Sequence, residues 1–295
     1  MNSPVWQRIP SHLGDVGGLT IRRALPTAAR RTIGAWCFLD HAGPAQLAPE
    51  AGMRVGPHPH TGLQTFSWLI EGQVLHRDSL GSEQLLRPGE VNLMTAGRGI
   101  AHSEESQSAR LHLAQLWIAL PEAQRFCAPA FEHFATLPRL PLGGFGATLL
   151  VGELLGQRSP VPSHSPLLGV DLHCLAPAEA TLALRPDFEY GVMVLEGDVR
   201  VDQHEPLGIG ELLYLAPGAD AMQLRASAGC RLLLLGGAPF DEPLLLWWNF
   251  VGREPEEIRQ FAADWNAEAT LFGAVQGFDG PRLKAPPVPA LRKPA

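Results

Sequence analysis

Cysteine, runs of basic residues and long uninterrupted apolar stretches are all scarce or missing in this 295-residue chain. Its four cysteines, Cys37, Cys127, Cys174 and Cys230, form no Cys-x-x-Cys pair. This favours reduced, mostly buried thiols over a disulfide framework or a zinc knuckle. No Lys/Arg-rich run interrupts a chain of net charge -7, so direct nucleic-acid binding is not expected.

Targeting and membrane segments are missing as well. The first 18 residues lack the basic start and the continuous apolar core of a secretory signal. The most apolar stretch, residues 232–251, is interrupted by glycine, proline and acidic residues too often for a membrane helix. We therefore expect a soluble, cytoplasmic protein without a membrane partner.

The sequence does contain many short apolar runs separated by Gly, Pro, Asp and Asn, while helical periodicity is scarce. Examples are residues 64–70, 73–78, 90–94 and 111–120. Regularly spaced short strands of this kind are typical of β-sandwiches and barrels. The pattern predicts an all-β protein.

Two parts of the chain resemble each other. Residues 68–75 (WLIEGQVL) resemble residues 193–200 (MVLEGDVR), and residues 88–97 (PGEVNLMTAG) resemble residues 209–218 (IGELLYLAPG). The chain is long enough for two cores of roughly 100–150 residues each. We therefore predict two related β domains.

A proline-rich connection at residues 121–141 marks the expected domain boundary. It contains one candidate short helix, residues 129–134. The predicted domains are residues 1–135 and residues 136–295.

The C-terminal part is predicted to hold an amphipathic helix and an extended tail. Pro255 can begin a helix. Apolar residues then recur at helical spacing for about three turns: Ile258, Phe261, Ala262 and Trp265. From Gly277 onward the chain has five prolines and no periodicity, so the tail either wraps the body or stays mobile.

Two ligand-like pairs, His58-x-His60 and His102-x-Glu104, lie about forty residues apart in strand-and-turn patterns. Residues two apart in a strand project from the same face. If the two strands face each other across one barrel, three imidazoles and one carboxylate converge. That donor set suits a divalent transition metal and leaves one or two positions open. The sequence predicts one metal site.

The segments around these pairs resemble the pirins, a family of bicupins. The resemblance rests on five motifs: residues 56–63 (GPHPHTGL), 69–72 (LIEG), 76–81 (HRDSLG), 87–90 (RPGE) and 94–104 (MTAGRGIAHSE). It implies two cupin (jelly-roll-like) β-barrels with a short C-terminal helix. It also implies a metal in the N-terminal barrel alone, held by His58, His60, His102 and Glu104.

The resemblance implies Fe(II) as the metal, while manganese, nickel, copper and zinc stay open because similar N/O ligand sets bind all of them. Some pirin-like proteins cleave quercetin with dioxygen, and others are assigned regulatory protein partners. We expect a flavonol (quercetin) 2,3-dioxygenase that takes a planar aromatic substrate and dioxygen. The alternatives are a redox-sensitive, metal-containing regulator with a protein partner and a non-catalytic small-molecule binder.

Gln64 departs from the family pattern, in which many members have Glu four residues after the second histidine. A neutral amide is a poorer ligand and no general base. If Gln64 lines the site, it can only orient a substrate or water. Proton abstraction from a flavonol hydroxyl then falls to Glu104 or to a metal-bound hydroxide. Glu104 and His102 are the predicted catalytic residues, the latter because it holds the metal.

The second half of the chain lacks the ligands. Counting from the matched residues 71–72 and 196–197 places Ala183 and Arg185 opposite the first pair, and counting from Gly97 and Gly218 places Gln223 and Arg225 opposite the second. None of these is a usual metal ligand at such a site. We expect the C-terminal barrel to be metal-free.

Other histidines and aromatic residues are expected to be structural. His41 and His76 are predicted to support the site rather than to ligate. Six further histidines are predicted to be surface or hydrogen-bonded residues: His12, His112, His133, His164, His173 and His204. Arg98 is either a cation near the site or a surface charge. Five aromatic residues are predicted to fill the core, one or two of them walling a planar ligand: Trp36, Phe38, Phe66, Trp68 and Trp117.

Overall fold

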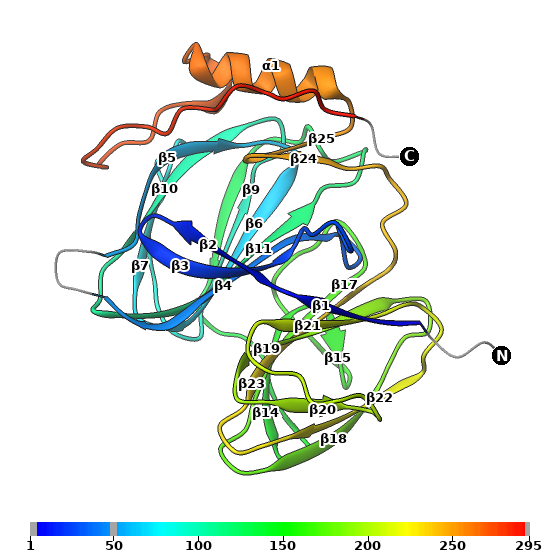
Figure 1. Cartoon of the computed structure of the whole chain (residues 1–295). Coiled ribbons are helices and arrows are strands. Elements are labelled where there is room, and N and C mark those ends of the chain that lie inside the picture. The colour runs from blue at the N-terminus through cyan, green and yellow to red at the C-terminus, as the bar shows by residue number, and fades with distance from the viewer. Residues whose placement is uncertain (1–4, 48–51, 293–295) are drawn as a thin grey trace. The chain divides into compact units, whose positions relative to one another are not determined.

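The computed structural model describes residues 5–47 and 52–292, and most of its regular structure is β-strand (Figure 1). This confirms the all-β prediction. The chain divides into two compact units, neither of which is continuous in sequence. Unit 1 contains residues 1–14, 22–41 and 136–240. Unit 2 contains residues 15–21, 42–135 and 241–295.

These units differ from the predicted domains, residues 1–135 and 136–295. Residues near the N-terminus join unit 1 because β1 (Trp6–Pro10) pairs antiparallel with β21 (Glu211–Leu215). The last 55 residues join unit 2, because the C-terminal helix packs its apolar face against residues of that unit such as Phe250 and Ala101. Sequence order therefore does not give the unit to which a segment belongs.

Unit 1 is built on a seven-stranded antiparallel sheet of order β1-β21-β19-β23-β17-β14-β13. A three-stranded sheet, β18-β22-β20, and a short hairpin, β15-β16, complete it. The strands after β1 are β13 (Arg139–Leu142), β14 (Phe145–Val151), β15 (Glu153–Leu154), β16 (Gln157–Arg158), β17 (Leu167–His173), β18 (Ala178–Ala183), β19 (Glu189–Glu196), β20 (Val199–Val201), β21, β22 (Ala221–Ala226) and β23 (Arg231–Gly237).

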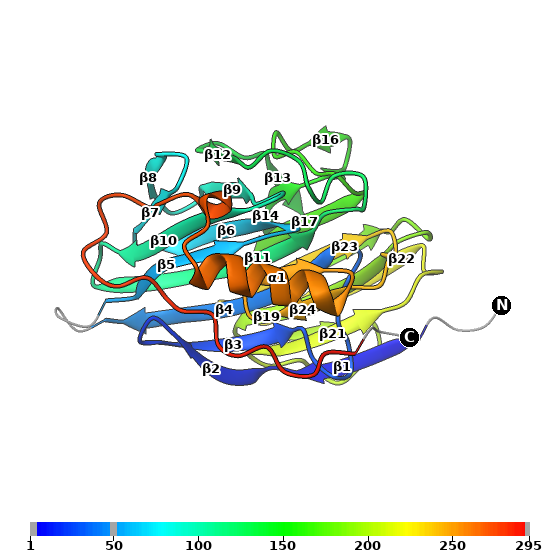
Figure 2. The ribbon, with the colours of Figure 1, turned by 90° about the horizontal axis from the view of Figure 1, so that it is seen from above.

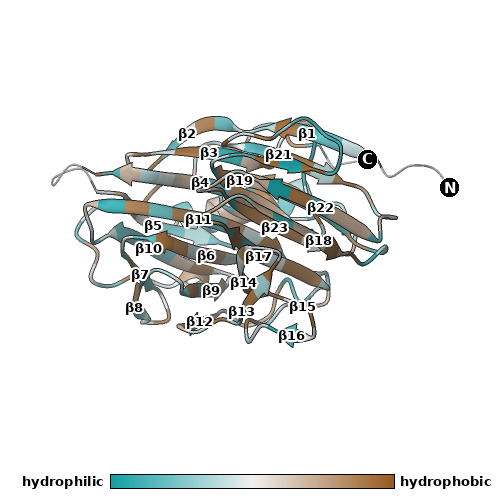
Figure 3. Cartoon of the chain, turned by 90° about the horizontal axis from the view of Figure 1, so that it is seen from below, coloured by the Kyte–Doolittle hydropathy of each residue, from teal (hydrophilic) through white to brown (hydrophobic). Residues whose placement is uncertain are grey.

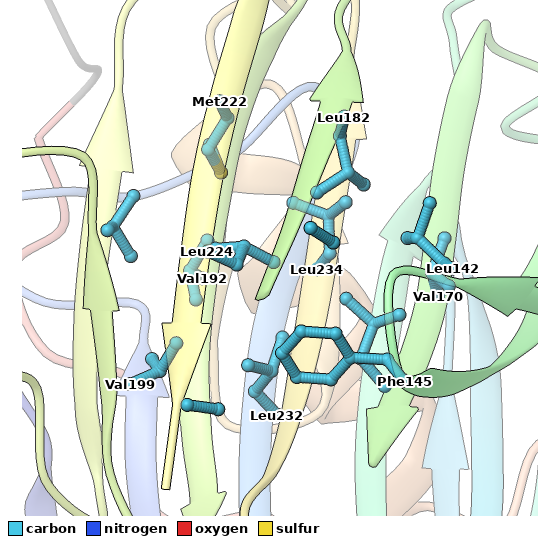
Figure 4. Close-up of a cluster of buried hydrophobic side chains, with 14 of the residues drawn as sticks. Leu142, Phe145, Val170, Leu182, Val192, Val199, Met222, Leu224, Leu232 and Leu234 are labelled. Atoms are coloured by element: carbon cyan, nitrogen blue, oxygen red, sulfur yellow. The ribbon is translucent and has the colours of Figure 1, made fainter. Parts of the chain in front are cut away.

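The core of unit 1 is a cluster of aliphatic side chains with Phe145 among them (Figure 4). Strands β17 and β23 lie inside the sheet and are coloured hydrophobic in Figure 3. Residues 232–235 of β23 are four consecutive leucines with no exposed surface. A strand buried on both faces needs apolar residues at every position, which explains this unbroken run.

Unit 2 has a seven-stranded sheet of order β12-β9-β6-β11-β4-β3-β2 and a four-stranded sheet of order β5-β10-β7-β8. Parts of three of these strands belong to unit 1: residues 12–14 of β2, 22–25 of β3 and 36–41 of β4. The strands are β2 (His12–Val16), β3 (Leu19–Leu25), β4 (Trp36–Gln46), β5 (Arg54–His60), β6 (Leu63–Glu71), β7 (Val74–Asp78), β8 (Glu83–Leu86), β9 (Val91–Thr95), β10 (Ile100–Ser106), β11 (Arg110–Ala119), β12 (Ala130–Phe134), β24 (Leu245–Trp247) and β25 (Phe250–Gly252).

The four apolar runs singled out in the sequence correspond to β6, β7, β9 and β11, as predicted. The candidate short helix at residues 129–134 is wrong. This segment is strand β12, in which Phe131 lies opposite Met94 and Phe134 opposite Val91 of β9. Its conformation is set by pairing with the edge of a sheet, a contact that local sequence does not record.

Helix α1 (Pro255–Asn266) begins and packs as predicted. The Glu257 carboxylate accepts hydrogen bonds from the backbone N–H groups of Arg253 (2.7 Å) and Glu254 (3.3 Å) at the start of the helix. The predicted apolar face is buried. A 3-10 turn, η1 (Thr270–Phe272), follows. Within the described residues, no helix is long and apolar enough to cross a membrane.

The C-terminal segment wraps unit 2, which decides between the two alternatives left open by the sequence. It lies beside α1 (Figures 1 and 2), where the indole of Trp265 donates to Leu283 O at 2.7 Å. The Leu283 N–H donates to Pro57 O of β5 at 2.8 Å. Because β5 is an edge strand of its sheet, the segment covers part of a strand edge that carries two predicted ligands.

Candidate metal centre

Strands β5 and β10 bring the three predicted imidazole ligands together. The strands pair antiparallel, with His102 opposite His58 and Ile100 opposite His60. The ring centroids lie 5.0 Å apart for His58 and His60, 4.3 Å for His58 and His102, and 4.9 Å for His60 and His102. One ring nitrogen from each lies within 4.8 Å of the others, and all three residues are buried.

Glu104 lies in a second group that shares His102. The pairing of β10 with β5 is irregular between His102 and Glu104, and Glu104 lies opposite Val55. Its carboxylate falls within 4.8 Å of ligand atoms of His76 and His102. Two overlapping groups therefore meet at His102: one with His58 and His60, and one with His76 and Glu104.

Backbone carbonyls fix which nitrogens of His58 and His60 carry protons. Nδ1 of His58 lies 2.9 Å from Gly56 O, and Nδ1 of His60 lies 3.1 Å from Asn249 O. A carbonyl oxygen can only accept, so both Nδ1 atoms donate. In the neutral rings, both Nε2 atoms then keep a free lone pair.

The contact with Asn249 depends on a close approach by strand β25. The turn between β5 and β6 contains Gly62, whose φ is +69°. A Cβ at this position would lie 2.2 Å from Val251 O. Glycine therefore lets the segment containing Asn249 reach the end of β5 and hold the His60 ring.

The spacing of the nitrogens fits a transition metal. Nε2 of His60 lies 3.0 Å from Nε2 of His102. Two nitrogens bound at right angles to one ion, each at about 2.0–2.1 Å, would be about 3.0 Å apart. Two facing lone pairs at this distance repel unless a proton or a cation lies between them. The donor set therefore matches a bound metal ion.

Burial keeps these rings neutral. It lowers the pKa of His58 to about 4 and holds the pKa values of His60 and His102 well below the ordinary 6.5, with the neighbouring imidazoles adding to the effect. Neutral imidazole is the form that binds a metal. Burial also raises the pKa of Glu104, opposed by nearby His76 and by the Ser67 hydroxyl 3.5 Å away.

His76, predicted to support the site rather than to ligate, lies in direct contact with His102. Its Nδ1 lies 3.4 Å from Nδ1 of His102, and its Nε2 lies 3.2 Å from Oδ2 of Asp78. Burial opposes ionisation of Asp78, but hydrogen bonds from His76 and Ser82 outweigh it and lower the pKa of this carboxyl. The sequence did carry a signal, because His76 and Asp78 show the same two-residue spacing as His58 and His60.

Gln64 and Ser67 lie on opposite faces of strand β6, and Ser67 is the one that approaches Glu104. The Gln64 amide donates to Thr95 Oγ1 at 3.0 Å. Residues three apart in a regular strand project from opposite faces, and β6 is regular over this stretch. The condition for a role of Gln64 in orienting substrate is therefore not met.

Trp117 is the predicted aromatic residue that lies against the cluster. Its ring lies at 76° to that of His60, with 5.2 Å between the centroids. Phe66 and Trp68 project from the Gln64 face of β6, and the indole of Trp36 donates to Leu168 O in unit 1. Arg98 is exposed.

Of the histidines outside the cluster, His133 is hydrogen-bonded as predicted, and His204 makes a ring contact instead. His133 bonds Asn92 Oδ1 at 2.8 Å, and His204 packs against Trp6. In unit 1, Glu179 contacts both Gln223 and Arg225. These two residues are the counterparts of His102 and Glu104 in the second half of the chain.

Two antiparallel β units, one with a buried histidine cluster on adjacent strands, define the chain as a bicupin. Residues 18–118 match the Pirin family model, and residues 169–270 match the Pirin C-terminal cupin domain. The chain belongs to the pirin family.

Relatives match over nearly the full chain. A Pseudomonas aeruginosa protein named as a candidate quercetin 2,3-dioxygenase is 51% identical, over 96% of this chain and 90% of that protein. A pirin-like protein of Caulobacter vibrioides is 39% identical, over 86% and 90%. The crystal structure of a quercetin 2,3-dioxygenase from Acinetobacter baumannii superimposes with a TM-score of 0.95 and 46% identity, covering 98% of this chain and 97% of that one.

Proposed function

We propose that this pirin is a metal-dependent oxygenase of the flavonol (quercetin) 2,3-dioxygenase type. The proposal rests on the convergence of three buried, neutral imidazoles, those of His58, His60 and His102. The Nε2 atoms of His60 and His102 lie 3.0 Å apart. The names of two relatives, 51% and 46% identical over nearly the whole chain, support the reaction type.

The proposed metal ligands are His58, His60, His102 and Glu104. Imidazole and carboxylate donors suit Fe(II), which we propose as the metal, and they also accept manganese, nickel, copper or zinc. When bound, the metal would polarise a chelating substrate and bring it next to dioxygen.

Glu104 is the proposed proton acceptor. A carboxylate whose pKa is raised by burial is a stronger base than an ordinary one, and so better matched to a phenolic hydroxyl. The Ser67 hydroxyl, 3.5 Å from Oε1, can orient it. Since a carboxylate has two oxygens, one can ligate while the other accepts the proton.

Trp117 is the proposed contact for a planar aromatic substrate. It is buried and lies edge to face with His60, so its ring offers a flat apolar surface beside one of the ligands. A flavonol could stack there while its oxygens point toward the histidines.

The proposal is tested by oxygen uptake with quercetin, using Fe(II)-loaded protein and metal analysis of the same sample. We expect uptake by the wild type, and we expect His102→Ala to lose both metal and uptake. His164→Ala is the matched control, because His164 is exposed and outside both metal-like groups. Equal uptake by wild type and His102→Ala would show that free metal or autoxidation causes the reaction, and would refute the proposal.

The alternatives predict other results from the same preparation. A redox-sensitive regulator would bind metal fully, consume no oxygen with chelating aromatic compounds, and capture a protein partner in only one oxidation state. A non-catalytic binder would show saturable quercetin binding without product.

A further inference from the structure

A chain of three buried side chains leads away from the candidate metal centre. It runs from His102 on β10 to His76 and then Asp78, both on β7, the strand that pairs with β10. The His76 ring stacks on Phe131 of β12, with the centroids 4.4 Å apart and 16° between the planes. This stacking and the contact with Asp78 hold the ring in one orientation.

Asp78 determines which nitrogen of His76 carries the proton. Its Oδ1 accepts hydrogen bonds from the backbone N–H groups of Leu80 (2.9 Å) and Ser82 (3.0 Å). Its Oδ2 faces Nε2 of His76 at 3.2 Å. A carboxylate can only accept, so the proton of this contact lies on Nε2. In the neutral ring, Nδ1 of His76 is then an acceptor.

The same argument continues to His102. Its Nδ1 faces the acceptor Nδ1 of His76 at 3.4 Å, so Nδ1 of His102 supplies the proton. The lone pair of His102 is left on Nε2, the atom that lies 3.0 Å from Nε2 of His60. Asp78, through His76, therefore aims the donor atom of His102 at the other two histidines.

We propose that His76 and Asp78 are positioning residues that make His102 bind the metal through Nε2, together with His58 and His60, and not through Nδ1 together with His76. Partners of this kind orient the histidine ligands of many metal sites. The inference rests on the proposed metal site and is independent of the oxygenase reaction.

Asp78→Asn gives a sharp test, because the structure fixes how the new amide would lie. The two backbone N–H groups at Leu80 and Ser82 need an acceptor, so the amide oxygen would face them and the NH2 group would face His76. The NH2 group would donate to Nε2 of His76. Nδ1 of His76 would then carry a proton and oppose the Nδ1 proton of His102.

The first readout is Co(II) binding to metal-free protein, measured by competition with a chelator and by the visible spectrum. We expect one Co(II) per chain in the wild type. Asp78→Asn should weaken Co(II) binding roughly 10–100-fold without changing this stoichiometry. His76→Phe keeps a ring against Phe131 but has no acceptor for the Nδ1 proton of His102, so it should weaken Co(II) binding by a similar factor. It replaces Asp78→Asn in this test if that variant does not fold.

Asp40→Asn is the matched control. Asp40 is also a buried carboxylate, but it pairs with Arg23 in unit 1 and lies outside both metal-like groups. We expect it to leave Co(II) affinity unchanged. An equal loss of affinity in Asp40→Asn and Asp78→Asn would mean that loss of a buried charge affects binding generally, and would overturn the assignment.

The second readout is the histidine tautomer in Zn(II)-loaded protein, from two-bond proton–nitrogen NMR correlations. The expected result is a proton on Nδ1 of His102 and zinc on Nε2. Zinc on Nδ1, or a second zinc ion per chain with His76 metallated, would overturn the inference. Wild type that binds neither cobalt nor zinc would instead refute the metal site itself, so the two failures are distinguishable.

Discussion

Acid should destabilise the metal-free protein through His58. Burial lowers the pKa of this residue from 6.5 to about 4. Between these values the unfolded chain binds a proton that the folded protein does not. The free energy of unfolding therefore falls as the pH falls through this window, and it is at its full value above pH 6.5.

The size of the effect follows from the two pKa values. The difference limits the total loss to about 3.4 kcal/mol at low pH, at about 1.36 kcal/mol per pH unit. Between pH 7.5 and pH 5.5, His58 alone should contribute a loss of about 1.3 kcal/mol. His60 and His102 shift in the same direction, so the loss in wild type should be larger.

Urea unfolding of chelator-treated protein at pH 7.5 and pH 5.5, followed by tryptophan fluorescence, measures this loss. In His58→Gln, the loss between the two pH values should be smaller than in wild type by about 1.3 kcal/mol. His164→Gln, at an exposed position, should behave as wild type. If His58→Gln loses as much stability on acidification as wild type, His58 is not held neutral and the reasoning fails.

Three further predictions concern unit 1. Arg231→Leu should lower the free energy of unfolding by about 3–5 kcal/mol, because it leaves the fully buried carboxylate of Asp171 without its partner; an unchanged urea midpoint would contradict this. Leu234→Ala should lower the free energy of unfolding by about 2–5 kcal/mol, because it leaves a cavity in the core. In the same assay, Leu175→Ala at an exposed position should change the free energy of unfolding by less than about 0.5 kcal/mol. Burial raises the pKa of Cys230 to about 12, so iodoacetamide at pH 8 should label it only after unfolding, and mass spectrometry that finds it labelled in folded protein would show a reactive thiol.

Short-range patterns predicted the histidine cluster well because the spacing of ligands within a strand is a local property. His58 and His60 share a face as residues two apart must, and the apolar runs became strands at the expected places. The proximity of His102 to His58 depends on the pairing of β5 with β10. The sequence did not predict that pairing; it was assumed as a condition for the ligands to converge.

Features that depend on tertiary contacts could not be predicted from the sequence. His76 was predicted to support the site, but its contact with His102 requires β7 to lie beside β10. The strand conformation of residues 130–134 requires the edge of β9. The face on which Gln64 lies follows from the alternation of β6, but which face points to Glu104 is set by the fold. Membership of residues 241–295 in unit 2 is likewise a result of packing.

The discontinuity of unit 2 has a consequence for biosynthesis. Residues 42–135, which contain the histidine cluster, are made before unit 1 is complete. The carbonyl of Asn249 that contacts His60 and the Leu283 amide that bonds Pro57 are made only after all 105 residues of 136–240 in unit 1. The nascent chain thus carries the histidines of the cluster before it carries the groups that hold them in place. A metal ion that reached the histidines before residues 241–292 are made would meet a cluster that lacks both of these contacts.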